Sequence, residues 1–102
     1  MNHKKDVLIN IKNDMKAIIY DIDEYRIAFR NNFDANQYFD IVQDHCYSMI
    51  DLIMKTISKF EHDIPQGNFT NIINTAEKIG KMLDKIFEFQ KDEFFVDLYA
   101  WQ

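Results

Sequence analysis

Apolar residues recur every three or four positions along most of this chain of 102 residues. That spacing places them on one face of an α-helix, because a helix completes a turn every 3.6 residues. The first such stripe continues through three heptads: Leu8, Ile11, Met15, Ile18, Ile22, Tyr25 and Phe29. We therefore expect a long amphipathic helix over residues 4–31, with this stripe facing a core.

A helix-start signal follows directly. Asp34 can act as an N-cap, Gln37 stands three residues later as in a capping box, and Phe33 can pack on Tyr38. The second helix is expected over residues 34–63, because Pro65 disfavours helical conformation at the residue before it. Its apolar stripe contains Phe39, Val42, Cys46, Ile50, Ile53, Ile57 and Phe60.

Residues 64–68 contain the single proline and one of the two glycines, so they form the turn with the most typical turn chemistry. Asn68 or Thr70 is expected to cap a third helix over residues 69–100. Gly80, inside that helix, is expected to permit close approach of a neighbouring helix. The third apolar stripe contains Ile72, Ala76, Ile79, Leu83, Ile86, Phe87, Phe94, Leu98 and Trp101.

Two Gly and one Pro are too few turn residues for an all-β sandwich or barrel. Helices of about 27 residues are each about 40 Å long, and short connections make neighbours antiparallel. With 47% hydrophobic residues, residues 1–102 can form one domain with its own core. The predicted fold class is all-α: an elongated antiparallel three-helix bundle of long helices, which homodimerisation could complete.

The first and third helices carry more apolar residues than a simple bundle needs. On a helical projection these extra residues form a second stripe on each of the two helices: Ile9, Tyr20 and Ile27 on the first, and Met82, Phe89 and Val96 on the third. Contiguous exposed apolar residues usually mark a binding surface. We expect these stripes to contact another protein or a second copy; the alternative is that splayed helices bury them internally.

Acidic residues also follow helical faces. The candidate acidic epitope contains Glu77, Asp84, Glu88 and Asp92 on the third helix, and Asp40, Asp44 and Asp51 on the second. Glu88 and Asp92 are a like-charge i, i+4 pair, which costs a few tenths of a kcal/mol. These faces could imitate the phosphates of a nucleic acid in the basic groove of an enzyme; the alternative is a solvated surface partly offset by interleaved lysines.

The charge balance excludes several classes of partner. Seventeen acidic and twelve basic residues give a net charge of −5, so we expect no direct binding to nucleic acid or to anionic membranes. No apolar run approaches the roughly 18 residues of a membrane span, and the first residues are too polar for a secretory signal. The single cysteine fits a reducing compartment, so the expected location is the cytoplasm.

Nothing in the sequence supports an enzyme, and no catalytic residue, cofactor or metal site is predicted. Asp44, His45 and Cys46 are consecutive, so on a helix they diverge and cannot converge on one ion. Cys46 falls within an apolar stripe and is expected to be a buried small hydrophobe rather than a nucleophile. No Gly-rich loop for phosphate is present.

The predicted function is therefore binding. We expect a small acidic, non-enzymatic helical module that binds and blocks another protein, of the inhibitor, immunity or antitoxin type found in bacteria and mobile elements such as phages. This rests on an analogy of size and composition. Two alternatives stay open: a homo-oligomeric helical scaffold or adaptor subunit, and the nucleic-acid mimic described above.

Overall fold

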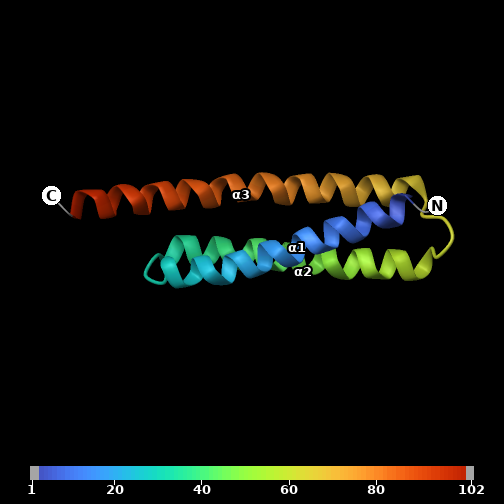
Figure 1. Ribbon diagram of the computed structural model, residues 1–102, viewed down its shortest axis with the longest axis horizontal. Coiled ribbons are helices and arrows are strands. Elements are labelled where there is room, and N and C mark those ends of the chain that lie inside the picture. The colour runs from blue at the N-terminus through green and yellow to red at the C-terminus, as the bar shows by residue number, and fades with distance from the viewer. Residues whose placement is uncertain (1–2, 101–102) are drawn as a thin grey trace.

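A computed structural model describes the backbone of residues 3–100 and the side chains of residues 3–89. The chain folds into three helices, α1 (His3–Ala28), α2 (Phe33–Lys59) and α3 (Gln66–Ala100). They run up, down and up along one long axis (Figure 1), and the described residues contain no strand. The predicted all-α three-helix bundle is confirmed.

The three helices do not contact one another equally. The molecule is elongated, with extents of 61 × 18 × 16 Å. Helices α1 and α2 form the most extensively packed pair, α3 packs mainly on α2, and contacts between α1 and α3 are the sparsest. Figure 1 shows α1 running obliquely, with its N-terminal end near the start of α3. The bundle is therefore least closed between α1 and α3.

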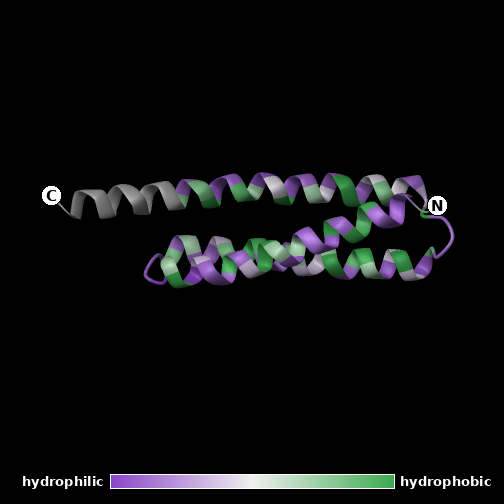
Figure 2. Ribbon diagram, viewed as in Figure 1, coloured by the Kyte–Doolittle hydropathy of each residue, from purple (hydrophilic) through white to green (hydrophobic). Residues whose placement is uncertain are grey.

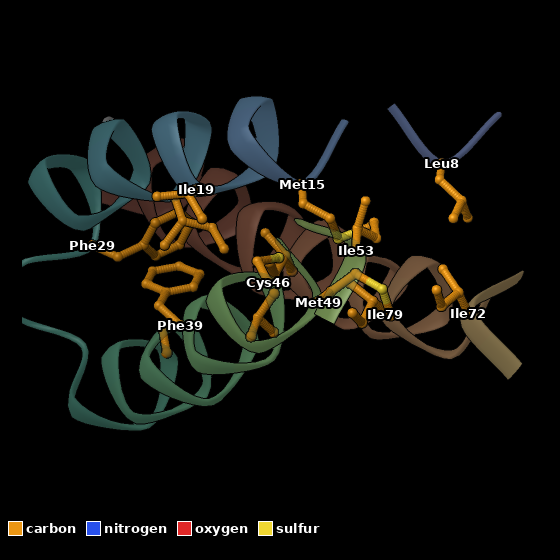
Figure 3. Packing of buried hydrophobic residues seen from close by; sticks show 14 of the residues in the cluster. Leu8, Met15, Ile19, Phe29, Phe39, Cys46, Met49, Ile53, Ile72 and Ile79 are labelled. Carbon is orange, nitrogen blue, oxygen red and sulfur yellow. The ribbon is translucent and has the colours of Figure 1, made fainter. Parts of the chain in front are cut away.

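The core follows the predicted stripes. Phe39 is fully buried, and its ring lies edge-on to Phe29 with 5.8 Å between ring centroids (Figure 3). Tyr25 packs on the same ring at 6.3 Å. Ile19 and Met49 are also buried, although neither belongs to a predicted stripe. The other buried apolar residues are Leu8, Met15, Ile22, Ala35, Val42, Cys46, Ile53, Ile64, Ile72, Ile79 and Ile86.

The turn between α1 and α2 differs from the prediction. Helix α1 ends at Ala28, and α2 begins at Phe33 with Asn32 as its N-cap. The Asn32 side chain accepts a hydrogen bond from the backbone N–H of Ala35 at 3.0 Å. Asp34, predicted as the cap, lies in the first turn instead. Asn and Asp are both favourable N-cap residues, and they stand only two positions apart here. The sequence alone could therefore not decide which of them caps α2.

The second connection also differs. Helix α2 ends at Lys59, four residues before the predicted end, and α3 begins at Gln66. The Pro65 carbonyl accepts the first helical hydrogen bond, from Phe69 N–H at 3.0 Å. Proline fits at a helix start because the first N–H groups need no helical partner. Asn68 and Thr70 therefore lie inside α3, and their predicted capping role is wrong.

Gly80 does not serve a close helix contact. A Cβ built on it would meet no atom within 4 Å beyond its chain neighbours and the backbone of its own helix, and the residue is exposed. The expected reason for a glycine at this position is therefore wrong: the space beside it is open.

Polar side chains tie α1 to α2 outside the core. Gln43 Nε2 donates to the Ile19 carbonyl at 3.1 Å and to Asp23 Oδ1 at 2.8 Å. Its Oε1 accepts a hydrogen bond from Arg26 at 2.7 Å. Arg26 also donates to Asp40 at 2.6 Å. These bonds fix the register of α1 against α2, because each joins one specific level of the two helices.

Hydrophobic and hydrophilic residues interleave along all three helices over the described side chains (Figure 2). No helix found there is long and apolar enough to cross a membrane.

Candidate functional site

An apolar groove lies where α1 and α3 face each other. Its walls and floor come from residues of both helices: Ile18, Asp21, Ile22, Tyr25, Leu83, Ile86 and Phe87. It contains a cavity of about 90 Å³. That volume suits one aliphatic side chain and is well below the roughly 300 Å³ of a small-molecule pocket. The groove therefore has the dimensions of a contact site for a protein side chain.

Helical spacing brings the groove residues together. Ile18 and Tyr25 are seven residues apart on α1, and Leu83 and Phe87 are four apart on α3, so each pair lies on one face. Ile22 and Ile86 are almost completely buried and belong to the core. Phe87 has 58% of its surface exposed. The groove thus has a buried apolar floor beside a large exposed aromatic ring.

The structure reverses the expected roles of two phenylalanines. Phe87 was predicted in the core stripe of α3 and Phe89 on its outer stripe. Phe89 and Met82 are instead half-buried against the core. The Phe89 ring lies 6.1 Å from the Tyr38 ring, and the Tyr38 hydroxyl donates to the Met82 carbonyl at 2.9 Å. Because α3 packs mainly on α2, the side of α3 that carries Met82 and Phe89 is turned toward α2, and Phe87 stays exposed beside α1.

The predicted second stripe on α1 is largely exposed. Tyr20 and Ile27 have 66% and 72% of their surfaces exposed, while Ile9 is half-buried. On α2, Tyr47 and Met54 are exposed as well, although no sequence pattern singled them out. Their spacing of seven was a usable signal, because it places both on one side of the helix. Val96 lies outside the described side chains.

The acidic epitope is divided by the fold. On α2, Asp40 is paired with Arg26 at 2.6 Å and Asp51 with Lys55 at 2.8 Å, while Asp44 is exposed. Two members of that line are therefore offset by cations of the same chain. On α3, Glu77, Asp84 and Glu88 are exposed, and Asp92 lies outside the described side chains. Imitation of phosphate rows stays a prediction.

Tyr38 links the acidic face of α3 to α2. Burial, and then the negative charges of Asp84 and Glu88, raise the pKa of Tyr38 above its ordinary value. The Lys85 ammonium lies 5.1 Å from the centre of the Tyr38 ring, a distance at which a cation and an aromatic face attract. An open, mixed polar depression surrounds this contact, lined by Asp34, Gln37, Tyr38, Ile41, Lys85 and Phe89.

Among the side chains that the structure describes, no three or more His, Cys, Asp or Glu residues are grouped to hold a metal ion. Cys46 is buried, and desolvation raises the pKa of its thiol to about 11. A thiol with that pKa is protonated at neutral pH and is a poor nucleophile. Its setting within the core matches the predicted role of a small hydrophobe.

Comparisons with protein families, curated proteins and solved structures found no match to this chain.

Proposed function

We propose that this chain is a non-enzymatic helical module that binds another protein through the groove between α1 and α3 and blocks that protein's own contacts. The observation that carries the proposal is the groove's construction: a buried floor at Ile22 and Ile86 beside the 58%-exposed Phe87. An inhibitor, immunity or antitoxin-type protein of a bacterium or mobile element is the class that we infer from its size, acidity and fold.

Physical chemistry supports a contact surface of this kind. Burial of apolar surface stabilises a complex by about 25 cal/mol per Å² before the costs of association. Large aromatic residues such as Phe87 contribute most when they fill or border a well-packed pocket. Acidic residues near the groove would accelerate encounter with a basic partner, while the apolar contacts would set the lifetime of the complex.

Affinity capture of binding proteins from the native source tests this proposal if wild-type and variant proteins are compared as baits. Wild-type protein and the Phe87→Asp variant are used as bait, with Ile27→Asp as the matched control because Ile27 is exposed on another face of α1. We expect a specific protein to be retained by the wild type and by Ile27→Asp, and lost with Phe87→Asp. Circular dichroism must show equal helicity for all three baits.

Other results would contradict the proposal. A protein that is lost with Ile27→Asp but retained by Phe87→Asp would show that the partner binds the predicted second stripe of α1 and not the groove. A set of captured proteins that is the same for all three baits would show that neither surface binds a specific partner.

A homo-oligomeric scaffold is the second candidate, favoured by the exposed residues of the α1–α2 pair. The hydrogen bonds of Gln43 to Asp23 and of Arg26 to Asp40 set a register in which Tyr20 stands at the level of Tyr47. Both tyrosines are mostly exposed. Sedimentation equilibrium decides between the candidates: a dimer that Tyr20→Asp dissociates would favour the scaffold, and a monomer at high concentration would exclude it.

A further inference from the structure

We propose that the groove between α1 and α3 binds an amphipathic helix whose apolar face is flanked by lysine or arginine residues. This inference rests on the proposed function and specifies the chemistry of the partner. It is carried by the charges along the two edges of the groove.

The α1 edge of the groove carries carboxylates. Asp21 lines the groove itself. Asp14 stands seven residues earlier, and both are three or four residues from Ile18, which also lines the groove. Residues three and four apart are neighbours on a helix surface. Asp14 and Asp21 therefore follow the groove along α1.

The α3 edge repeats this arrangement. Asp84 is three residues before the groove residue Phe87, and Glu77 is seven residues before Asp84. Both carboxylates are exposed. The exposed Gly80 lies between them, and no atom of another helix comes within 4 Å of the place where its Cβ would stand. Lys81 is exposed as well, four residues after Glu77 and three before Asp84. The α3 edge therefore carries two carboxylates and one cation, and it is open to an approaching helix.

Other cations of α1 and α3 lie on the sides of these helices that face α2. Lys85 contacts Tyr38 of α2, and Lys78 stands seven residues before it, on the same side of α3. On α1, Arg26 bonds to α2. Lys16 stands seven residues before Asp23, which also bonds to α2. Beside the groove stand four carboxylates, Asp14, Asp21, Glu77 and Asp84, and one cation, Lys81, so carboxylates outnumber cations there.

This pattern selects a basic helix over a second copy of the chain. In a symmetric dimer through this groove, each edge would meet an edge of the other copy that also carries an excess of carboxylates. Like charges placed opposite each other oppose association. An amphipathic helix in a groove is a common mode of recognition, with apolar anchors at i, i+3, i+4 and i+7. Lysine or arginine beside those anchors would face the two edges.

Synthetic peptides test the inference directly. The probe is a helical peptide of about 15 residues, long enough to cover the roughly 17 Å from Asp14 to Tyr25, with leucine along one face and lysine at the flanking positions. A twin peptide has the same leucines and glutamate in place of lysine. By fluorescence anisotropy we expect the lysine peptide to bind about tenfold more tightly than its twin, with a difference that shrinks as salt is added.

Variants of the full chain localise the binding. Asp21→Asn and Asp84→Asn should each weaken the lysine peptide about two- to fivefold, and Phe87→Ala should weaken both peptides. The single variant Asp44→Asn is the matched control, because it removes the same one charge from an exposed position of α2 and should leave the affinity unchanged. An equal loss in that control would mean that net charge alone attracts the peptide, which overturns the inference.

The remaining outcomes are also decisive. Equal affinity for the two peptides, no binding of the lysine peptide, or a dimer that Phe87→Ala dissociates would each overturn the basic-helix inference. If a captured partner still depends on Phe87 in that case, the proposed function stands and only the partner's chemistry is wrong. If no partner depends on Phe87, the proposed function fails too.

Discussion

At the scale of single residues, Cys46 shows how burial sets chemistry. Its thiol is enclosed by the core, and desolvation raises its pKa to about 11. The folded protein therefore holds the thiol proton at pH values where the unfolded chain releases it. Stability from this group is complete below the unfolded pKa of about 8.5 to 9 and is lost as the pH rises through about 11.

The expected result is a stability difference that depends on pH. Between pH 9 and about 11, the wild type should lose up to about 1.4 kcal/mol of unfolding free energy per pH unit relative to Cys46→Ala. Urea unfolding of both proteins at several pH values measures this, with reductant present to keep the thiol free. A constant difference between them would contradict the buried protonated thiol.

Single residues also differ in how well the sequence predicted whether they are buried. The core stripes of α1 and α2 were predictable from apolar spacing, because both helices pack extensively. Phe87 and Phe89 were assigned to the wrong environments because periodicity gives the faces of a helix but not its rotation against two unequal neighbours. Only the tertiary packing of α3 on α2 decides which phenylalanine is covered.

At the scale of helices, the start of α2 gives a direct comparison. Asn32 is the N-cap, with its side chain bonded to Ala35 N–H at 3.0 Å, and Asp34 stands in the first turn. We expect Asn32→Ala to lower the free energy of unfolding by about 1 kcal/mol and Asp34→Ala by only a few tenths, through the helix dipole. Thermal and urea unfolding measure both. A larger loss of stability for Asp34→Ala than for Asn32→Ala would instead favour Asp34 as the N-cap, as the sequence predicted.

Gly80 provides a second prediction at this scale. It lies inside α3, where glycine costs about 1 kcal/mol relative to alanine, and an added Cβ would meet only open space. Gly80→Ala should therefore raise the free energy of unfolding by about 0.5 to 1 kcal/mol. Urea unfolding tests this, and a loss of stability would show that a neighbour does contact this position.

At the scale of the whole molecule, the groove results from unequal packing. The number of helices, their order and the Pro65 turn could be predicted, because these depend on local patterns. The sparse contact between α1 and α3 could not, because it depends on how α1 crosses the other two helices. The sequence therefore predicted Met82 and Phe89 on an exposed face, whereas they pack against the core, and of the carboxylates beside the groove it singled out Glu77 and Asp84 but not Asp14 and Asp21.

Amide chemical-shift mapping tests the central claim most directly. A ¹⁵N-labelled sample of the chain is titrated with the captured partner, or with the lysine-flanked peptide. We predict shift changes concentrated at Ile18, Asp21, Tyr25, Leu83 and Phe87. Changes concentrated instead at Tyr20, Ile27 and Tyr47, with the groove signals unmoved, would contradict binding between α1 and α3.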